Sequence, residues 1–253
     1  MGQQSSGGTR IAFFGGTFDP PHLGHLGVAR AARTALGLDT VLFAPVGTQP
    51  LKPQGTVAGF EDRLAMTRLA IAADPAFALS LADAPNPSGA PNYTLETLLA
   101  LRAQLPPGNT LFCLMGADSF ASFRRWHRAA EIPFVAPLIV ASRPAQPLDN
   151  LDSALPAGLS LKPAPEPNRV ASEIPLRRYI LRNPDGELAP FYLLPGLHID
   201  ISASQIRELI REQIRAQTRI SAQSPHAAAA RTPDSSLLPA PVLDYIRAHN
   251  LYR

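Results

Sequence analysis

The sequence predicts an α/β fold: a Rossmann-like parallel sheet flanked by helices, with a small helical part at the C-terminal end. Short apolar runs alternate with longer segments of helical periodicity, which is the order that a parallel sheet with crossover helices requires. Proline and glycine stand at most boundaries between these segments. The first apolar run also leads through a glycine-rich turn into a helix, and α/β proteins bind phosphates at such turns.

The individual elements follow from the same periodicities, taken in order along the chain. Strands are expected in the short apolar runs at 11–15, 40–44, 77–81, 110–115, 137–141 and 197–200. Helices are expected where apolar residues recur at helical spacing, at 23–36, 60–73, 94–104, 119–124, 204–216 and 239–249. The first of these helices is followed by Gly37, a residue that favours a helix C-terminus.

These elements divide the chain into three parts. Residues 1–10 are polar and are expected to form a disordered tail, 11–200 form the Rossmann-like domain, and 201–253 form the helical C-terminal part. The span 144–176 is rich in Pro, Ala and Leu with weak periodicity, so a long excursion from the domain is expected there. The span 217–236 has low complexity and is expected to be a flexible insertion.

Composition narrows the class of protein. The 253 residues are 45% apolar, which suffices for a core, but no apolar run approaches the roughly 20 residues of a membrane span. No signal-peptide pattern follows the polar start, so a cytoplasmic protein without a membrane partner is expected. The single cysteine, Cys113, lies in an apolar run and is expected to be a buried strand thiol. The net charge is +3 without a dense arginine run, which argues against a nucleic-acid partner, and a homo-oligomer stays open.

The turn after the first strand carries the strongest chemical signal, Gly15-Gly16-Thr17-Phe18-Asp19-Pro20-Pro21-His22-Leu23-Gly24-His25. Two glycines let backbone N–H groups approach a phosphate closely and allow positive φ, and Thr17 adds a hydroxyl. His22 and His25 share a face of the following helical turn, where they can donate to phosphate oxygens as charge develops. The alternative interpretation is a proline-rich turn with two surface histidines.

A second motif lies far downstream, Ile201-Ser202-Ala203-Ser204-Gln205-Ile206-Arg207. Ser202 or Ser204 can cap the helix that follows. Arg207 then lies on the first helical turn, where a guanidinium can clamp phosphate. Taken alone, the segment is equally compatible with an ordinary capped amphipathic helix.

Together these motifs resemble the signature of the nucleotidyltransferase superfamily that carries a T/HxGH motif. The downstream motif is similar to the ISSTxIR segment of its adenylyltransferases, with Ala203 where Ser is usual. Further segments resemble bacterial nicotinate-mononucleotide adenylyltransferase: Val41–Lys52, with Leu51 in place of the usual His, Glu61–Met66, Asn92–Leu98, Leu114–Phe120 with Trp126-His127, and Leu238–Tyr252. The matches run from residue 11 to 252, interrupted by the two excursions.

The resemblance implies that ATP and nicotinate mononucleotide are converted to deamido-NAD and pyrophosphate. It implies Mg²⁺ carried on the ATP phosphates, without a dedicated protein cage. The catalytic residues that it implies are His22, His25, Lys52 and Arg207. The implied ATP-binding residues are Gly15, Gly16, Thr17, Asp118, Ser202 and Ser204, and those for nicotinate mononucleotide are Tyr93, Thr94, Trp126, His127 and Arg143.

Alternatives remain at two levels. Trp126 is expected to stack on the nicotinate ring. The alternative is that this single tryptophan only packs in the hydrophobic core. A pantetheine-phosphate adenylyltransferase or a cytidylyltransferase would share the HxGH turn, though it should lack Tyr93-Thr94 and Trp126. A nucleotide-binding regulatory module without turnover is the rival from another class, against which the retained histidines argue. The sequence contains no GxSxG hydrolase elbow and no GxGxxG dinucleotide fingerprint.

Overall fold

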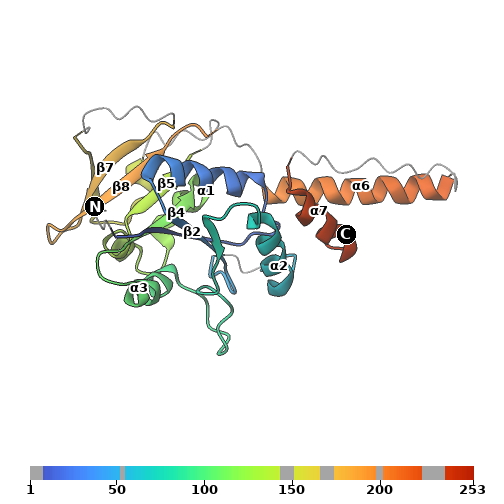
Figure 1. The fold of residues 1–253 in the computed structure, drawn as a ribbon, viewed down its shortest axis with the longest axis horizontal. Helices are drawn as coiled ribbons and strands as arrows, with labels where there is room; N and C mark the ends of the chain where they lie inside the picture. The colour runs from blue at the N-terminus through green and yellow to red at the C-terminus, as the bar shows by residue number, and fades with distance from the viewer. Residues whose placement is uncertain (1–7, 52–54, 143–150, 166–173, 198–201, 224–236) are drawn as a thin grey trace, which may run out of the picture.

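The computed structural model describes residues 8–51, 55–142, 151–165, 174–197, 202–223 and 237–253 (Figure 1). They build one eight-stranded sheet in the order β3-β2-β1-β4-β5-β8-β7-β6. Neighbouring strands are parallel from β3 to β8, namely β3 (Phe77–Leu79), β2 (Thr40–Pro45), β1 (Arg10–Gly16), β4 (Thr110–Gly116), β5 (Leu138–Ala141) and β8 (Leu188–Leu194). Two antiparallel strands, β7 (Arg177–Arg182) and β6 (Ser160–Pro163), complete the sheet.

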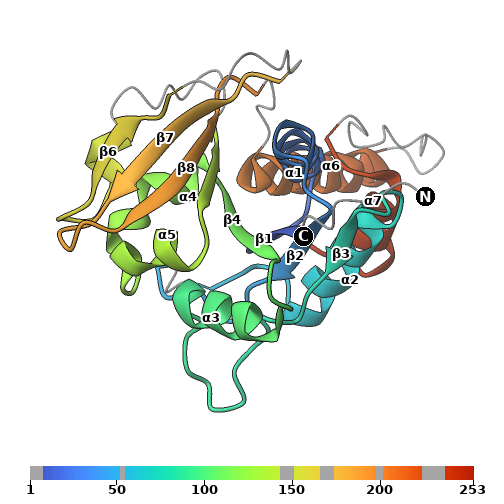
Figure 2. The same cartoon turned by 60° about the vertical axis from the view of Figure 1, so that its left-hand side comes forward.

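Helices cover both faces of this sheet, and two hydrophobic clusters lie between the layers (Figure 2). One face carries α1 (Leu23–Leu36), α2 (Phe60–Ile71), α6 (Ala203–Gln223) and α7 (Ala240–Ala248). The other carries α3 (Thr94–Gln104), α4 (Ala117–Ala121) and α5 (Ile132–Val135). Successive residues of a strand point to opposite faces, so Ala12 and Phe14 enter the first cluster and Phe13 the second. This doubly covered parallel sheet confirms the predicted fold class.

Beyond shifts of one or two residues at element ends, the structure differs from the predicted elements as follows. The helix expected at 119–124 is divided into α4 and a 3₁₀ turn at Phe123–Arg125. The strand expected at 197–200 is wrong at Leu197, which lies in no strand, and the remaining three residues lie outside the described part. The last parallel strand is β8 instead, which pairs with β5 on one side and with the antiparallel β7 on the other. The span 144–176 contributes β6, and α6 extends to Gln223, beyond the expected end at 216.

The remaining expectation about the core concerns the single cysteine. Cys113 lies in β4 with 2% of its surface exposed, which confirms the predicted buried strand thiol. Burial raises the pKa of this thiol to about 12, so it stays protonated and unreactive at neutral pH. Among the helices of the described residues, none is long and apolar enough to cross a membrane.

Candidate functional site

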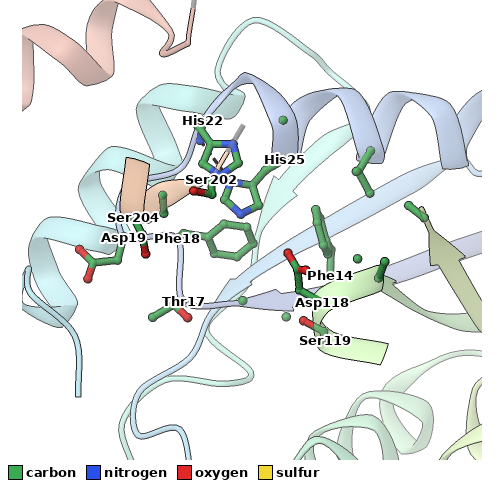
Figure 3. A pocket seen from close by; sticks show the side chains of 18 of the residues that line it. Phe14, Thr17, Phe18, Asp19, His22, His25, Asp118, Ser119, Ser202 and Ser204 are labelled. Carbon is green, nitrogen blue, oxygen red and sulfur yellow. Dashed lines mark hydrogen bonds between the residues drawn. The ribbon is translucent and has the colours of Figure 1, made fainter. Parts of the chain in front are cut away.

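A cavity of about 420 Å³ opens at the carboxyl ends of the central strands (Figure 3). Its lining comes from the carboxyl ends of β1, β4 and β5 with the segments that follow them, from the start of α6, and from Gly55, Val57 and Leu197. Strand order reverses direction between β1 and β4, and open α/β sheets bind ligands at this kind of position. Nine of the expected site residues line the cavity together: Gly15, Gly16, Thr17, His22, His25, Asp118, Ser202, Ser204 and Arg207.

The glycine pair ends β1 directly beneath the cavity. A Cβ at Gly15 would lie 2.8 Å from atoms of the Phe13 ring, and one at Gly16 would lie 3.0 Å from the Phe18 ring. Neither glycine has positive φ; the left-handed residue of the turn is Phe18, with φ of 49°. The close approach of aromatic rings therefore favours glycine at both positions, and the positive φ that glycine allows is used at neither.

The two histidines stand side by side at the start of α1 (Figure 3). Their ring centroids are 3.7 Å apart, and only 4% of His22 is exposed. The backbone N–H of His22 donates to Nδ1 of His25 at 3.2 Å. Because Nδ1 accepts this bond, a neutral His25 ring carries its proton on Nε2, which makes Nε2 a hydrogen-bond donor. Such a donor at a helix N-terminus suits a phosphate oxygen.

The start of α6 brings hydroxyls and one guanidinium to the same cavity. Ser202 and Gln205 form a reciprocal cap: the Gln205 N–H donates to Ser202 Oγ at 3.2 Å, and the Ser202 N–H donates to Gln205 Oε1 at 3.1 Å. Of the two candidate caps, Ser202 is thus the one used. Arg207 donates through Nη2 to Ser204 Oγ at 3.1 Å and through Nη1 to the Asp19 carbonyl at 2.6 Å. These bonds hold the guanidinium beside the β1–α1 turn.

Sequence reasoning assigned no role to Asp19, although it lies within the first motif. Its carboxylate is 4% exposed and accepts from the N–H groups of Val57 and Ala58, at 2.7 and 3.2 Å. It also accepts from the Tyr252 hydroxyl at 2.7 Å. Asp19 thereby joins three segments that are far apart in sequence.

Arg63 of α2 is a second residue that sequence reasoning missed. It is 1% exposed, and it donates to the carbonyls of Thr17 and Val46 at 2.7 and 2.9 Å. Burial lowers its pKa, while the charge of Asp19 acts in the opposite direction. An arginine in a helix is usually solvated, and helical spacing alone does not reveal that this one is buried under the turn.

Asp83 is the third residue that was missed, and it lies under the glycine pair. Its Oδ2 would be 3.8 Å from a Cβ at Gly15, and 4% of the residue is exposed. Burial raises the pKa of this carboxyl, and a hydrogen bond of 2.7 Å from Thr97 Oγ1 lowers it by a smaller amount. No motif pointed to Asp83, since it stands in a loop without periodicity.

Four of the five residues expected to bind nicotinate mononucleotide, namely Tyr93, Thr94, Trp126 and His127, lie at the start of α3 and in the segment that follows the 3₁₀ turn at Phe123–Arg125. The rings of Tyr93 and His127 are 4.3 Å apart at an interplanar angle of 31°. Thr94 is the first residue of α3. Trp126 is half-buried, and its Nε1 donates to Ser122 Oγ at 3.2 Å.

The loop after β2 connects this group to the cavity. Thr17 donates through its hydroxyl to Gln49 Oε1 at 3.3 Å, and the neighbouring Thr48 N–H donates to Asn92 Oδ1 at 2.9 Å. Asn92 directly precedes Tyr93. Of the other expected site residues, Lys52 and Arg143 lie outside the described part, whereas Leu51 is 40% exposed.

The donors of the cavity suit phosphate oxygens rather than a metal ion. The side chains that line the cavity include hydroxyls, two imidazoles and one guanidinium, all of which can donate to phosphate oxygens, together with the carboxylates of Asp19 and Asp118. In the part of the chain that the structure describes, no group of three or more His, Cys, Asp or Glu side chains is placed to hold a metal.

The sequence of the chain matches a family model and several known proteins. The cytidylyltransferase-like family model matches residues 13–209. A probable nicotinate-nucleotide adenylyltransferase of Trichlorobacter lovleyi is 38% identical over 204 residues, covering 81% of this chain and 89% of the relative. Another, of Dechloromonas aromatica, is 35% identical over 250 residues, covering 96% and 97%.

Solved structures agree on the fold. The nicotinic acid mononucleotide adenylyltransferase of Plasmodium falciparum, complexed with NaAD, aligns with a TM-score of 0.63 at 15% identity. The alignment covers 96% of this chain and 97% of that one.

Proposed function

The chain belongs to the cytidylyltransferase-like family and, within it, to the nicotinate-nucleotide adenylyltransferases, and we propose that its cavity transfers the adenylyl group of ATP to nicotinate mononucleotide. The products are deamido-NAD and pyrophosphate, and the reaction is a step of NAD biosynthesis. The observation that carries this proposal is the convergence of both sequence motifs, from β1–α1 and from α6, on one cavity at the switch point of the sheet.

The cavity residues are assigned to the triphosphate. Gly15, Gly16 and Thr17 line the cavity at the end of β1. Their N–H groups and the Thr17 hydroxyl are assigned to the α-phosphate. His25 donates from Nε2 to an α-phosphate oxygen, and His22 acts on the neighbouring phosphates. The start of α6 contacts the β- and γ-phosphates, which leave as pyrophosphate, through Ser202, Ser204 and Arg207. Lys52 is proposed for the same end, and Asp118 for the ATP sugar.

The reaction requires positioning and charge stabilisation more than proton transfer. An oxygen of the mononucleotide's 5′-phosphate attacks the α-phosphorus of ATP and forms a new P–O bond. The bond from that phosphorus to the α,β-bridging oxygen breaks, and its electron pair leaves with pyrophosphate. The attacking oxygen is already anionic at neutral pH, so no general base is needed. Catalysis then rests on holding the two phosphates in line and on donors that meet the developing charge.

The second substrate is assigned to the group beside α3. Backbone N–H groups at Thr94 and His127 are proposed to hold the nicotinate carboxylate, and Tyr93 to line the pocket. Trp126 is proposed to stack on the ring. Arg143 is proposed for the mononucleotide phosphate. The loop after β2 is hydrogen-bonded through Gln49 to Thr17 and through Thr48 to Asn92, so the two proposed subsites are neighbours.

Magnesium is proposed to enter on the ATP phosphates and to retain most of its waters. The donor set of the cavity fits this, because its cationic and N–H groups contact phosphate oxygens rather than the ion. When bound, Mg²⁺ neutralises charge on the leaving phosphates.

Pyrophosphate release in the presence of MgATP tests the proposal. Nicotinate mononucleotide, nicotinamide mononucleotide and phosphopantetheine are supplied side by side as acceptors. Fast release with nicotinate mononucleotide alone is expected. Comparable release with both mononucleotides removes the carboxylate subsite but keeps the chemistry. Release only with phosphopantetheine indicates another member of the superfamily, and ATP binding without any release supports a regulatory module.

A further inference from the structure

We infer that Tyr252 is a positioning residue for the phosphate end of the cavity, acting through Asp19 on Arg207. The inference rests on the proposed function for the identity of the nucleotide. It arises from a chain of hydrogen bonds that connects the end of the described chain to the β1–α1 turn. Asp19 and Arg207 lie within the two motifs that suggested the site, whereas Tyr252 lies outside both.

Tyr252 is fixed on the far side of the turn. The residue is 4% exposed and packs into the cluster that also holds α1, α2 and α7. The preceding residue is fixed by a bond of 3.0 Å from the Leu251 N–H to the Ile246 carbonyl. Burial and the neighbouring Asp19 raise the pKa of the phenol, so its O–H stays protonated and remains a donor at neutral pH.

Asp19 faces two ways, and this makes it a connector. Its carboxylate points away from the two histidines (Figure 3) and accepts from Tyr252 and from the N–H groups at 57 and 58. Its backbone carbonyl accepts from Arg207 Nη1 at 2.6 Å. Anchoring the side chain therefore fixes the peptide that holds the guanidinium. Val57 itself lines the cavity, so the same anchor also places part of that wall.

A second contact ties the same C-terminal segment to the turn. The Leu23 N–H, at the start of α1, donates to the Leu237 carbonyl at 3.0 Å. The turn is thus held at Asp19 and at Leu23 by residues that flank α7, Tyr252 after the helix and Leu237 before it. A loss of the Tyr252 hydroxyl removes one of these two holds and leaves the overall packing of the ring in place.

The test compares two tyrosine-to-phenylalanine variants. Tyr252→Phe removes the bond to Asp19. Tyr245→Phe is the matched control, because Tyr245 on α7 also donates to a carboxylate, Asp62 of α2, at 3.0 Å, and neither residue lines the cavity. Calorimetry without acceptor gives the MgATP dissociation constant of each, and thermal unfolding gives their Tm values.

We expect Tyr252→Phe to weaken MgATP binding about five- to tenfold, the scale of one ordinary hydrogen bond, because the lost bond acts on the ligand only indirectly, while Tyr245→Phe leaves binding within about twofold. In an Arg207→Met background, Tyr252→Phe should have little further effect, because its action passes through that guanidinium. Unchanged binding in Tyr252→Phe, an equal loss in both variants, or full additivity with Arg207→Met would overturn the inference. Absent ATP binding by the wild type would overturn it as well.

These outcomes separate the inference from the proposed reaction. Pyrophosphate release by the wild type decides the reaction, whereas the MgATP constants of the variants decide the role of Tyr252. A wild type that binds ATP without releasing pyrophosphate would refute the reaction alone. Normal release together with unchanged binding in Tyr252→Phe would refute the positioning role alone.

Discussion

Replacing the buried Arg63 by methionine should lower the free energy of unfolding of the protein by an amount that the structure allows us to estimate. The guanidinium donates to the carbonyls of Thr17 and Val46 at 2.7 and 2.9 Å, and only 1% of the residue is exposed. Methionine fills similar volume but leaves both carbonyls without these donors. Hydrogen bonds to charged groups contribute about 1.5–3 kcal/mol each, so two contribute about 3–6 kcal/mol.

Part of that loss is offset because methionine avoids the desolvation of a buried cation. The lowered pKa of Arg63, caused first by burial, indicates that this cost is present. A net loss of about 2–4 kcal/mol in the free energy of unfolding is therefore expected for Arg63→Met. The turn that begins at Thr17 should also shift, so MgATP binding should weaken.

Urea unfolding of three proteins measures this prediction: the wild type, Arg63→Met and Arg68→Met. Arg68 lies on the same helix but is exposed, and a surface change of this kind usually alters stability by about 0.5 kcal/mol or less. The midpoint should fall for Arg63→Met with little change in the slope. A loss below about 1 kcal/mol for Arg63→Met, or one no larger than that of Arg68→Met, refutes the reasoning.

Three further predictions concern single residues. Burial raises the pKa of Asp83 in the folded protein, so ionising this carboxyl costs stability. The free energy of unfolding of the wild type, relative to that of Asp83→Asn, should therefore fall as the pH rises from below 3.8 through the raised pKa. Urea unfolding across that pH range measures the difference, and a difference that does not change with pH would contradict the prediction. Ser202→Ala should lose about 1 kcal/mol of stability with the helix cap and raise the KM for ATP more than it lowers kcat; an unchanged KM would argue against a phosphate contact at this helix start. Trp126 is the single tryptophan, so saturating nicotinate mononucleotide should quench the protein's tryptophan fluorescence, and unaltered emission would refute stacking.

The parallel core could be predicted because its signals are local. Each strand from β1 to β5 is a short apolar run that is followed or preceded by a segment of helical periodicity. Such local patterns predict the elements that the structure contains. The residues of both motifs could be placed for the same reason, since each motif lies within one turn and its helix. Their meeting at one cavity was an expectation from resemblance, and it depends on contacts between residues far apart in sequence.

The β7–β8 hairpin was missed although a signal was present. Its turn reads Asn183-Pro184-Asp185-Gly186, and the Gly186 N–H donates to the Asn183 carbonyl at 3.1 Å with Gly186 at φ of 87°. A Pro-Asp-Gly turn between two alternating segments is a hairpin pattern. The weak periodicity of the preceding span obscured it, so the last strand was expected at 197–200 instead.

The polar network under the turn could not be found from the sequence at all. Asp19 lies in the β1–α1 turn, Arg63 in α2 and Tyr252 after α7, and no sequence spacing relates them. Their importance comes from burial: each is 4% exposed or less, and a buried polar group must find its partner in the fold. Only the three-dimensional arrangement supplies those partners.

A single-turnover experiment on His25→Ala tests the central claim, that this cavity stabilises adenylyl transfer. Enzyme in excess over MgATP and saturating nicotinate mononucleotide gives the rate of pyrophosphate formation, and calorimetry gives the MgATP dissociation constant. Loss of one donor to the developing charge should cost about 2–4 kcal/mol, which slows the step about 30- to 900-fold while the dissociation constant changes less than about tenfold. A variant within about threefold of the wild-type rate would contradict the account.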